Sequence, residues 1–152
     1  MKRILAMMLA VLMLCLVGCG NKAADVEIDV ASVYAEMEGI LPEMVVLDQD
    51  RMLNYCGIQV QHFTQATVAV CSDGLRADEI WLIEAADADA LKTLEELAEG
   101  RLTRKGEESI TYSPEQYKVV ENAETIVVGN YLAVIVSPDV DKLVEIFNQA
   151  AN

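Results

Sequence analysis

The chain has 152 residues, and 25 Asp and Glu against 11 Lys and Arg give it a formal net charge of −14. This length suits one domain and leaves little room for two. The negative charge argues against binding to nucleic acid, whose phosphates need a basic surface. The hydrophobic fraction of 53% would suggest a membrane protein if its distribution along the chain were ignored.

The N-terminal segment has the pattern of a secretory signal. Lys2 and Arg3 precede an uncharged apolar run over residues 4–17, and Cys19 follows one small residue later. A basic start, a short apolar core and a small residue before the cut are typical of such signals. The run is shorter than the roughly 20 apolar residues of a membrane-spanning helix. We therefore predict that residues 1–18 are a cleaved signal peptide, with an uncleaved anchor or an ordinary secretory signal as the alternatives.

The residues Leu16-Val17-Gly18-Cys19 resemble the lipobox of bacterial lipoproteins. The resemblance implies that the thiol of Cys19 receives a diacylglyceryl group and that the signal peptidase cuts just before it. Two acyl chains suit stable anchoring, because one chain alone holds a protein only marginally. We expect a protein that is lipid-anchored to the extracytoplasmic face of the bacterial cell membrane. The segment 19–28 would consist of the lipidated Cys19 and a short tether, which reaches roughly 30 Å when extended.

Cleavage before Cys19 changes what the composition means. The remaining 134 residues are about half hydrophobic, as in an ordinary soluble domain, and carry a charge of −16. Such acidity keeps a domain soluble and repels it from anionic lipid headgroups. We expect residues 29–152 to form a single extracytoplasmic α+β domain that stands off the membrane on its lipid.

The first half of this domain shows clear helical and strand periodicities. Asp29 can cap a helix over 30–41, in which apolar residues recur at helical spacing. The next segments are predicted to be an apolar link over 43–47, a short helix over 49–55, a strand with one buried face over 58–71 and its returning partner over 79–85. Trp81 lies in this returning strand and is expected in the core.

The second half opens with a long amphipathic helix that starts at Asp87 or Asp89. A long polar connection over 106–122 follows, then a hairpin around the Gly129-Asn130 turn and a C-terminal helix capped by Ser137. The hairpin strands are apolar on both faces, so we expect them to be central or covered on both sides. The predicted fold is α+β, with helices packed on a four-stranded, mostly antiparallel sheet in the order α-α-β-β-α-β-β-α.

Besides Cys19, the domain contains Cys56 and Cys71. A pair of cysteines in an exported protein invites a disulfide. If residues 60–71 form one strand, however, its ends lie about 35–40 Å apart, whereas a disulfide needs Cα atoms within about 7 Å. Free thiols are therefore favoured, although a bend in the strand would allow a bridge. Neither Cys has a second Cys or a His at metal-ligand spacing, so we expect no zinc site.

His62, the only histidine, could act as a base at an exposed strand start. No nucleophile with a carboxylate partner can be placed beside it, so we expect a structural role. The Asp and Glu residues could supply an acid–base pair or a Ca²⁺ site, but their spacings never form a calcium-binding loop. Asp87, Asp89, Asp139 and Asp141 lie at predicted helix starts. Because negative charge is favourable at helix N-termini, we expect these aspartates to cap the helices and to face solvent. No catalytic residue, cofactor or metal site is predicted.

Tyr112 and Tyr117 flank a Pro within the polar connection. Exposed aromatic residues on a loop can mark a partner site, so these two form our candidate partner surface. Alternatively, they fasten the loop to the core. The basic cluster of Arg101, Arg104 and Lys105 falls in the predicted last turns of the preceding helix, where it complements the helix dipole. This cluster is too small to bind nucleic acid.

Three short motifs carry a family resemblance: Ala77-Asp78-Glu79-Ile80, Tyr112-Ser113-Pro114-Glu115-Gln116-Tyr117 and Gly129-Asn130-Tyr131. In this order, and together with the lipobox and the length, they resemble the bacterial lipoprotein family known as domain of unknown function 4358. The resemblance covers the chain from about Val30 to Phe147. It implies a small anchored protein of Gram-positive-type cells, and it implies no reaction, cofactor or catalytic residue.

These observations predict a non-enzymatic protein, anchored to the membrane through the lipid on Cys19. Its partner would be an envelope protein or a small ligand, and not nucleic acid. The alternative is a small envelope enzyme whose acidic side chains assemble only in the fold.

Overall fold

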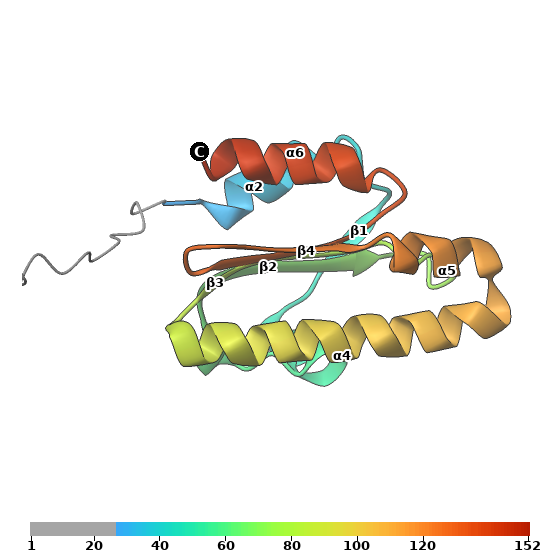
Figure 1. Ribbon diagram of the computed structural model, residues 1–152, viewed down its shortest axis with the longest axis horizontal. Helices are drawn as coiled ribbons and strands as arrows, with labels where there is room; N and C mark the ends of the chain where they lie inside the picture. Colours follow the sequence, from blue (N-terminus) through green and yellow to red (C-terminus); the bar gives the residue numbers. More distant parts are fainter. Residues whose placement is uncertain (1–26) are drawn as a thin grey trace, which may run out of the picture.

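The computed structural model of the protein describes residues 27–152, which form a five-stranded sheet between two layers of helices (Figure 1). The predicted signal over 1–18, Cys19 and most of the tether over 19–28 lie outside the described residues. The arrangement confirms the α+β class. Within the described part, no helix combines the length and apolar character that crossing a membrane requires.

Helices and strands follow one another in an order close to the predicted one. Their bounds are α2 (Val30–Met37), β1 (Met44–Val46), α3 (Gln49–Arg51), the π-helix η2 (Met52–Cys56), the 3₁₀-helix η3 (Val60–His62), β2 (Phe63–Cys71), β3 (Glu79–Ala85), α4 (Ala88–Tyr112), α5 (Pro114–Glu121), β4 (Glu124–Val128), β5 (Tyr131–Val136) and α6 (Val140–Ala150).

The sheet is antiparallel throughout, with the strand order β1-β2-β3-β5-β4. The prediction of four strands is wrong, because the apolar link over 43–47 contains a fifth strand. In this strand, β1, Met44 pairs with Cys71 and Val46 pairs with Ala69. Three residues are too few to show the alternation by which a strand is recognised in a sequence. The predicted strand over 58–71 is also shorter in the structure, since η3 occupies its start.

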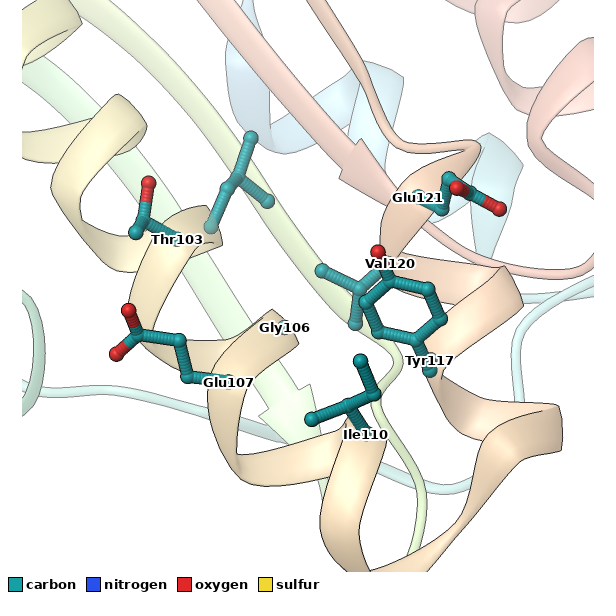
Figure 2. Close-up of a pocket in the computed structure, with 8 residues that line it drawn as sticks. Thr103, Gly106, Glu107, Ile110, Tyr117, Val120 and Glu121 are labelled. Carbon is teal, nitrogen blue, oxygen red and sulfur yellow. The ribbon is translucent and has the colours of Figure 1, made fainter.

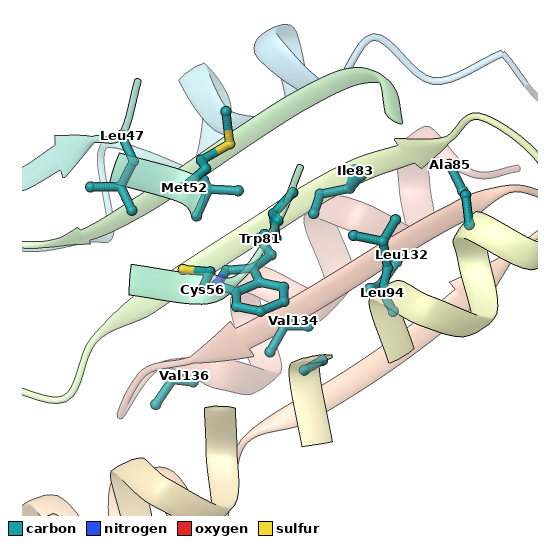
Figure 3. Packing of buried hydrophobic residues seen from close by; sticks show 14 of the residues in the cluster. Leu47, Met52, Cys56, Trp81, Ile83, Ala85, Leu94, Leu132, Val134 and Val136 are labelled. Atoms are coloured by element: carbon teal, nitrogen blue, oxygen red, sulfur yellow. The ribbon is translucent and has the colours of Figure 1, made fainter. Parts of the chain in front are cut away.

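The sheet separates two apolar clusters. On one face, residues of η2, α4 and α5 pack against β2, β3 and β5, and the fully buried Trp81 is part of this cluster, as predicted (Figure 3). On the other face, α2 and α6 bury Met37 and Phe147. Strand β5 is buried at every residue, whereas β4 is an edge strand with exposed residues. The prediction that both hairpin strands are central or covered is therefore right for β5 and wrong for β4.

The polar connection over 106–122 is not a loop. Helix α4 continues to Tyr112, and after one residue α5 begins at Pro114. Ser113 ends α4 and caps α5, its hydroxyl accepting a hydrogen bond from the backbone N–H of Gln116 at 3.4 Å. Gly106 is buried within α4, and a Cβ at this position would lie 3.8 Å from the ring of Tyr117. The small residue thus allows α5 to pack closely against α4.

Aspartates cap three helices, as predicted for Asp29 and Asp87. Asp29, Asp48 and Asp87 each accept a hydrogen bond from a backbone N–H in the first turn of the helix that follows. The prediction of Ser137 as a cap is wrong, because α6 begins only after Asp139. The hydroxyl of Ser137 instead accepts from the backbone N–H of Asp139 in a local turn, at 3.2 Å.

Candidate functional site

A cluster of buried charges lies at the start of β3, where α4 crosses the sheet. The side chain of Glu79 is only 2% exposed. Arg101 donates to it through Nη2, 2.8 Å from Oε2, and through Nε, 3.0 Å from Oε1. Lys105 Nζ lies 3.0 Å from Oε2, and Trp81 Nε1 donates to Oε1 at 2.8 Å. Both carboxylate oxygens of Glu79 are therefore occupied by donors from the same protein.

The electrostatics of this cluster favour an ionised Glu79. Burial raises the pKa of its carboxyl group, but the hydrogen bond from Arg101 and the charge of Lys105 outweigh burial, and the pKa lies below its usual value. Burial alone would lower the pKa of Arg101, but the hydrogen bond to Glu79 and the negative charge of Glu79 raise this pKa above its usual value. The cluster holds α4 against β3 and leaves no carboxylate oxygen of Glu79 for a substrate.

Cys56 lies beside this cluster, within the apolar core (Figure 3). Burial, together with the charge of Glu79, raises the pKa of its thiol to about 12. A thiol of this kind is a poor nucleophile at neutral pH, because the reactive species is the thiolate. Cys56 and the half-buried Cys71 are both free, which confirms the interpretation that they do not form a disulfide.

The end of α4, the linking Ser113 and the start of α5 form a corner at one end of the molecule, which we call the α4–α5 corner (Figure 1). Two contacts join this corner to the loop between β2 and β3. Lys105 Nζ donates to the carbonyl oxygen of Ala77 at 2.8 Å, and the backbone N–H of Ala77 donates to Oε1 of Gln116 at 2.8 Å. The corner and the loop are thus held together by hydrogen bonds on both sides of one residue.

A groove of about 620 Å³ lies between this loop and the corner, and we call it the polar groove. Leu75 on the loop and Tyr112 at the end of α4 line it, and their exposed fractions of 85% and 87% are the largest of the exposed large hydrophobic residues in the described part. Lys105, which also lines it, is engaged by Glu79, and Arg76 is engaged by Asp78, with Nε 3.0 Å from Oδ2.

A second groove, of about 330 Å³, lies between α4 and α5, and we call it the apolar groove (Figure 2). Tyr117 lines it and is half-buried, while Ile110 is 57% exposed. Carboxylates stand on both helices, Glu107 on α4 and Glu121 on α5. The full lining comprises Leu102, Thr103, Gly106, Glu107, Ile110, Tyr117, Val120 and Glu121.

The structure separates the two tyrosines of the candidate partner surface. Tyr112 lines the polar groove and Tyr117 lines the apolar groove, so both flank the α4–α5 corner but they share no groove. Their predicted placement on a loop is wrong, because both lie in helices. Each of the two interpretations therefore applies to one tyrosine. Tyr112 is exposed, as a partner surface requires, whereas Tyr117 packs α5 against α4 over Gly106.

The other candidate residues are in local, structural contacts. The Nδ1 atom of His62 accepts a hydrogen bond from the backbone N–H of Gln59 at 3.2 Å. Asp87 caps α4, and Asp139 pairs with Lys142 at 2.6 Å. Asp89 and Asp141 lie in the first turns of their helices, where the helix dipole favours acids. Across residues 27–152, no group of three or more His, Cys, Asp or Glu side chains could hold a metal ion.

The three residues of the basic cluster also have different surroundings in the structure. Arg101 and Lys105 point to Glu79, while Arg104 is exposed. The prediction that these residues lie in the last turns of the helix is wrong, since α4 extends to Tyr112. Sequence analysis missed Glu79, although its place at the edge of an apolar strand is a signal, because a buried carboxylate needs a cationic partner.

Comparison with known proteins identifies one family. The model of the family described as "Domain of unknown function (DUF4358)" matches residues 37–137, a span that includes all five strands and both helices of the α4–α5 corner. No curated protein and no solved structure gives a significant match to the chain.

Proposed function

Since the chain belongs to the family described as Domain of unknown function (DUF4358), we propose that it is a lipid-anchored binding module of the bacterial cell envelope. In this proposal Cys19 carries the lipid, and the α4–α5 corner binds a partner on the extracytoplasmic side of the membrane. The lipobox and the preceding apolar run support the anchor. The corner supports the binding role.

The observation that carries the binding role is the exposure of Leu75 and Tyr112 on the lining of the polar groove. Large apolar side chains next to a groove are typical of interaction sites, and Tyr is enriched in protein interfaces. The hydrogen bonds of Lys105 and Gln116 to Ala77 fix the loop relative to the corner. A pre-organised surface of this kind loses little conformational entropy on binding.

The alternative, a small envelope enzyme, needs a carboxylate that reaches a substrate. Glu79 lies in the buried charge cluster, and its two oxygens accept from Arg101, Lys105 and Trp81. A carboxylate with a lowered pKa and occupied oxygens is a poor proton acceptor. This arrangement argues against Glu79 as the catalytic carboxylate of such an enzyme.

A photo-crosslinking amino acid at position 112 tests the proposal in living cells. We expect a defined protein adduct from Tyr112, and we expect Leu75→Glu to reduce it, because the two residues line one groove. Tyr55 is the matched control, since it is a tyrosine on η2 that is 57% exposed and lines neither groove. The proposal is wrong if position 112 gives no adduct, or if positions 112 and 55 give the same adducts.

A further inference from the structure

The apolar groove between α4 and α5 combines a hydrophobic lining with unpaired negative charge. Its apolar side chains are those of Leu102, Ile110, Tyr117 and Val120, and Figure 2 labels the last three. Its volume of about 330 Å³ is at the lower end of the range of about 300–1,000 Å³ for ligand pockets. The space is thus suited to one or two apolar side chains rather than to a large ligand.

Glu107 and Glu121 stand on the two helices that border this groove. Neither carboxylate is in a salt bridge with another residue of the described chain, in contrast to Glu79 and Asp78. Glu108, one residue further along α4, lines the polar groove and is also outside the salt bridges of the described residues. The corner therefore offers exposed negative charge beside exposed apolar surface.

Charge complementarity restricts what can occupy the groove. A second copy of this chain would add its own excess of acids, since the formal charge is −14. Anionic lipid headgroups are repelled for the same reason. A segment with Lys or Arg beside an apolar side chain meets both features, because the apolar side chain fills the groove and the cations pair with the two carboxylates.

We infer that the apolar groove binds an apolar side chain of a basic polypeptide segment from a partner protein, with Glu107 and Glu121 pairing the flanking Lys or Arg residues. The inference rests on the proposed function, because it takes from it that the corner binds a partner. It adds the chemistry of the segment that is recognised.

A labelled peptide tests this chemistry directly. The probe is a fluorescein-labelled Lys-Lys-Leu-Leu-Lys-Lys peptide, and the protein is the full chain in nanodiscs of zwitterionic lipid, with empty nanodiscs as the blank. Fluorescence polarisation should show saturable binding that weakens with salt. The peptides Lys-Lys-Ser-Ser-Lys-Lys and Glu-Glu-Leu-Leu-Glu-Glu should each bind at least about tenfold more weakly, because each lacks one of the two features.

Surface variants locate the binding on the groove. Ile110→Glu and the pair Glu107→Lys with Glu121→Lys should each weaken binding about tenfold. Leu53→Glu is the matched control for the first, because Leu53 is an exposed apolar residue elsewhere, and Glu36→Lys with Glu145→Lys is the control for the second. The controls should change the affinity by less than about twofold, since they lie outside the groove.

Four results would overturn the inference. Equal binding of the Ser-containing peptide, or equal weakening by the control variants, would show non-specific attraction to an acidic protein. Self-association in sedimentation that Ile110→Glu abolishes would identify a second copy as the occupant. Absence of peptide binding while the adduct at Tyr112 forms would reject the basic chemistry and leave the proposed function standing; absence of both would reject the two together.

Discussion

Arg101 on α4 binds the carboxylate of Glu79 on β3 through two nitrogen atoms, with Nη2 2.8 Å from Oε2 and Nε 3.0 Å from Oε1. The residues are separated by 22 positions in the chain, and their side chains are 17% and 2% exposed. This pair fixes the position of α4 along the sheet. It therefore also fixes the α4–α5 corner, which lies three turns further along the same helix.

Removal of Arg101 should strongly destabilise the protein. Arg101→Ala leaves the buried carboxylate of Glu79 with one cationic partner fewer, and loss of one member of a buried ion pair costs about 3–5 kcal/mol. Arg104→Ala is the matched control, because Arg104 is exposed on the same helix and should change the free energy of unfolding by less than about 0.5 kcal/mol. Urea unfolding measures both. Equal effects would contradict a structural role of the pair.

The stability should fall in acid, and Glu79 should contribute to this fall. The pKa of Glu79 is lower in the folded protein than its ordinary value of 4.5. The folded state therefore binds this proton less readily than the unfolded state, so the contribution to stability is present above pH 4.5 and is lost as the pH falls through the folded pKa. Glu79→Gln should be less stable near pH 7 and should show a weaker pH dependence below pH 4.5. Parallel curves for the two proteins would disprove this assignment.

Gly106 should tolerate a methyl group and no more. A Cβ there would lie 3.8 Å from Tyr117 and 3.9 Å from Val120, which is ordinary contact. Gly106→Ala should thus stabilise α4 by up to about 1 kcal/mol, as should Gly100→Ala, whose Cβ would meet nothing within 4 Å. Gly106→Leu should destabilise the protein by about 1–3 kcal/mol, because the larger side chain forces α5 away. Gly100→Leu, which should be tolerated, is the control, and thermal unfolding measures the stability of both variants.

Lipidation of Cys19 predicts a change in membrane attachment. Cys19→Ala should either release the protein from the membrane fraction or leave it unprocessed, since no acyl chains can be added. Cys15→Ala provides the control, because this residue lies within the predicted signal and is discarded on cleavage. Cell fractionation and the mass of the processed chain report the outcome. Normal processing and membrane retention of Cys19→Ala would rule out the lipid anchor.

The parts of the fold that repeat a pattern over many residues could be predicted from the sequence. The returning strand at 79–85 has its predicted bounds, and Asp87 caps the long helix as expected. The parts that depend on contacts between distant segments could not be predicted. Strand β1 forms only because it pairs with β2, and α5 is apolar only where it meets Gly106 and its neighbours on α4.

In the candidate site, too, the local pattern could be predicted and the contacts between distant segments could not. Tyr112 was identified from its type and its position beside Pro114, and it is exposed in the structure. Leu75 was not identified, because nothing in the sequence places the loop after β2 next to the end of α4. The contact depends on Lys105 and Gln116, whose hydrogen bonds to Ala77 span 28 and 39 residues.

The first described residues of the chain are hydrogen-bonded to the sheet at the end far from the α4–α5 corner. The backbone N–H of Ile28 donates to the hydroxyl of Tyr131, and Gln65 Nε2 donates to the carbonyl of Ile28 at 2.9 Å. Helix α4 starts near this end and runs 25 residues toward the other, a length of about 37 Å. The corner therefore lies at the end of the molecule that is farther from the first described residues. If Cys19 carries the lipid, as proposed, the length of α4 separates the corner from the point of attachment, and a partner with an extracytoplasmic domain would reach it more readily than one with only short loops at the membrane surface.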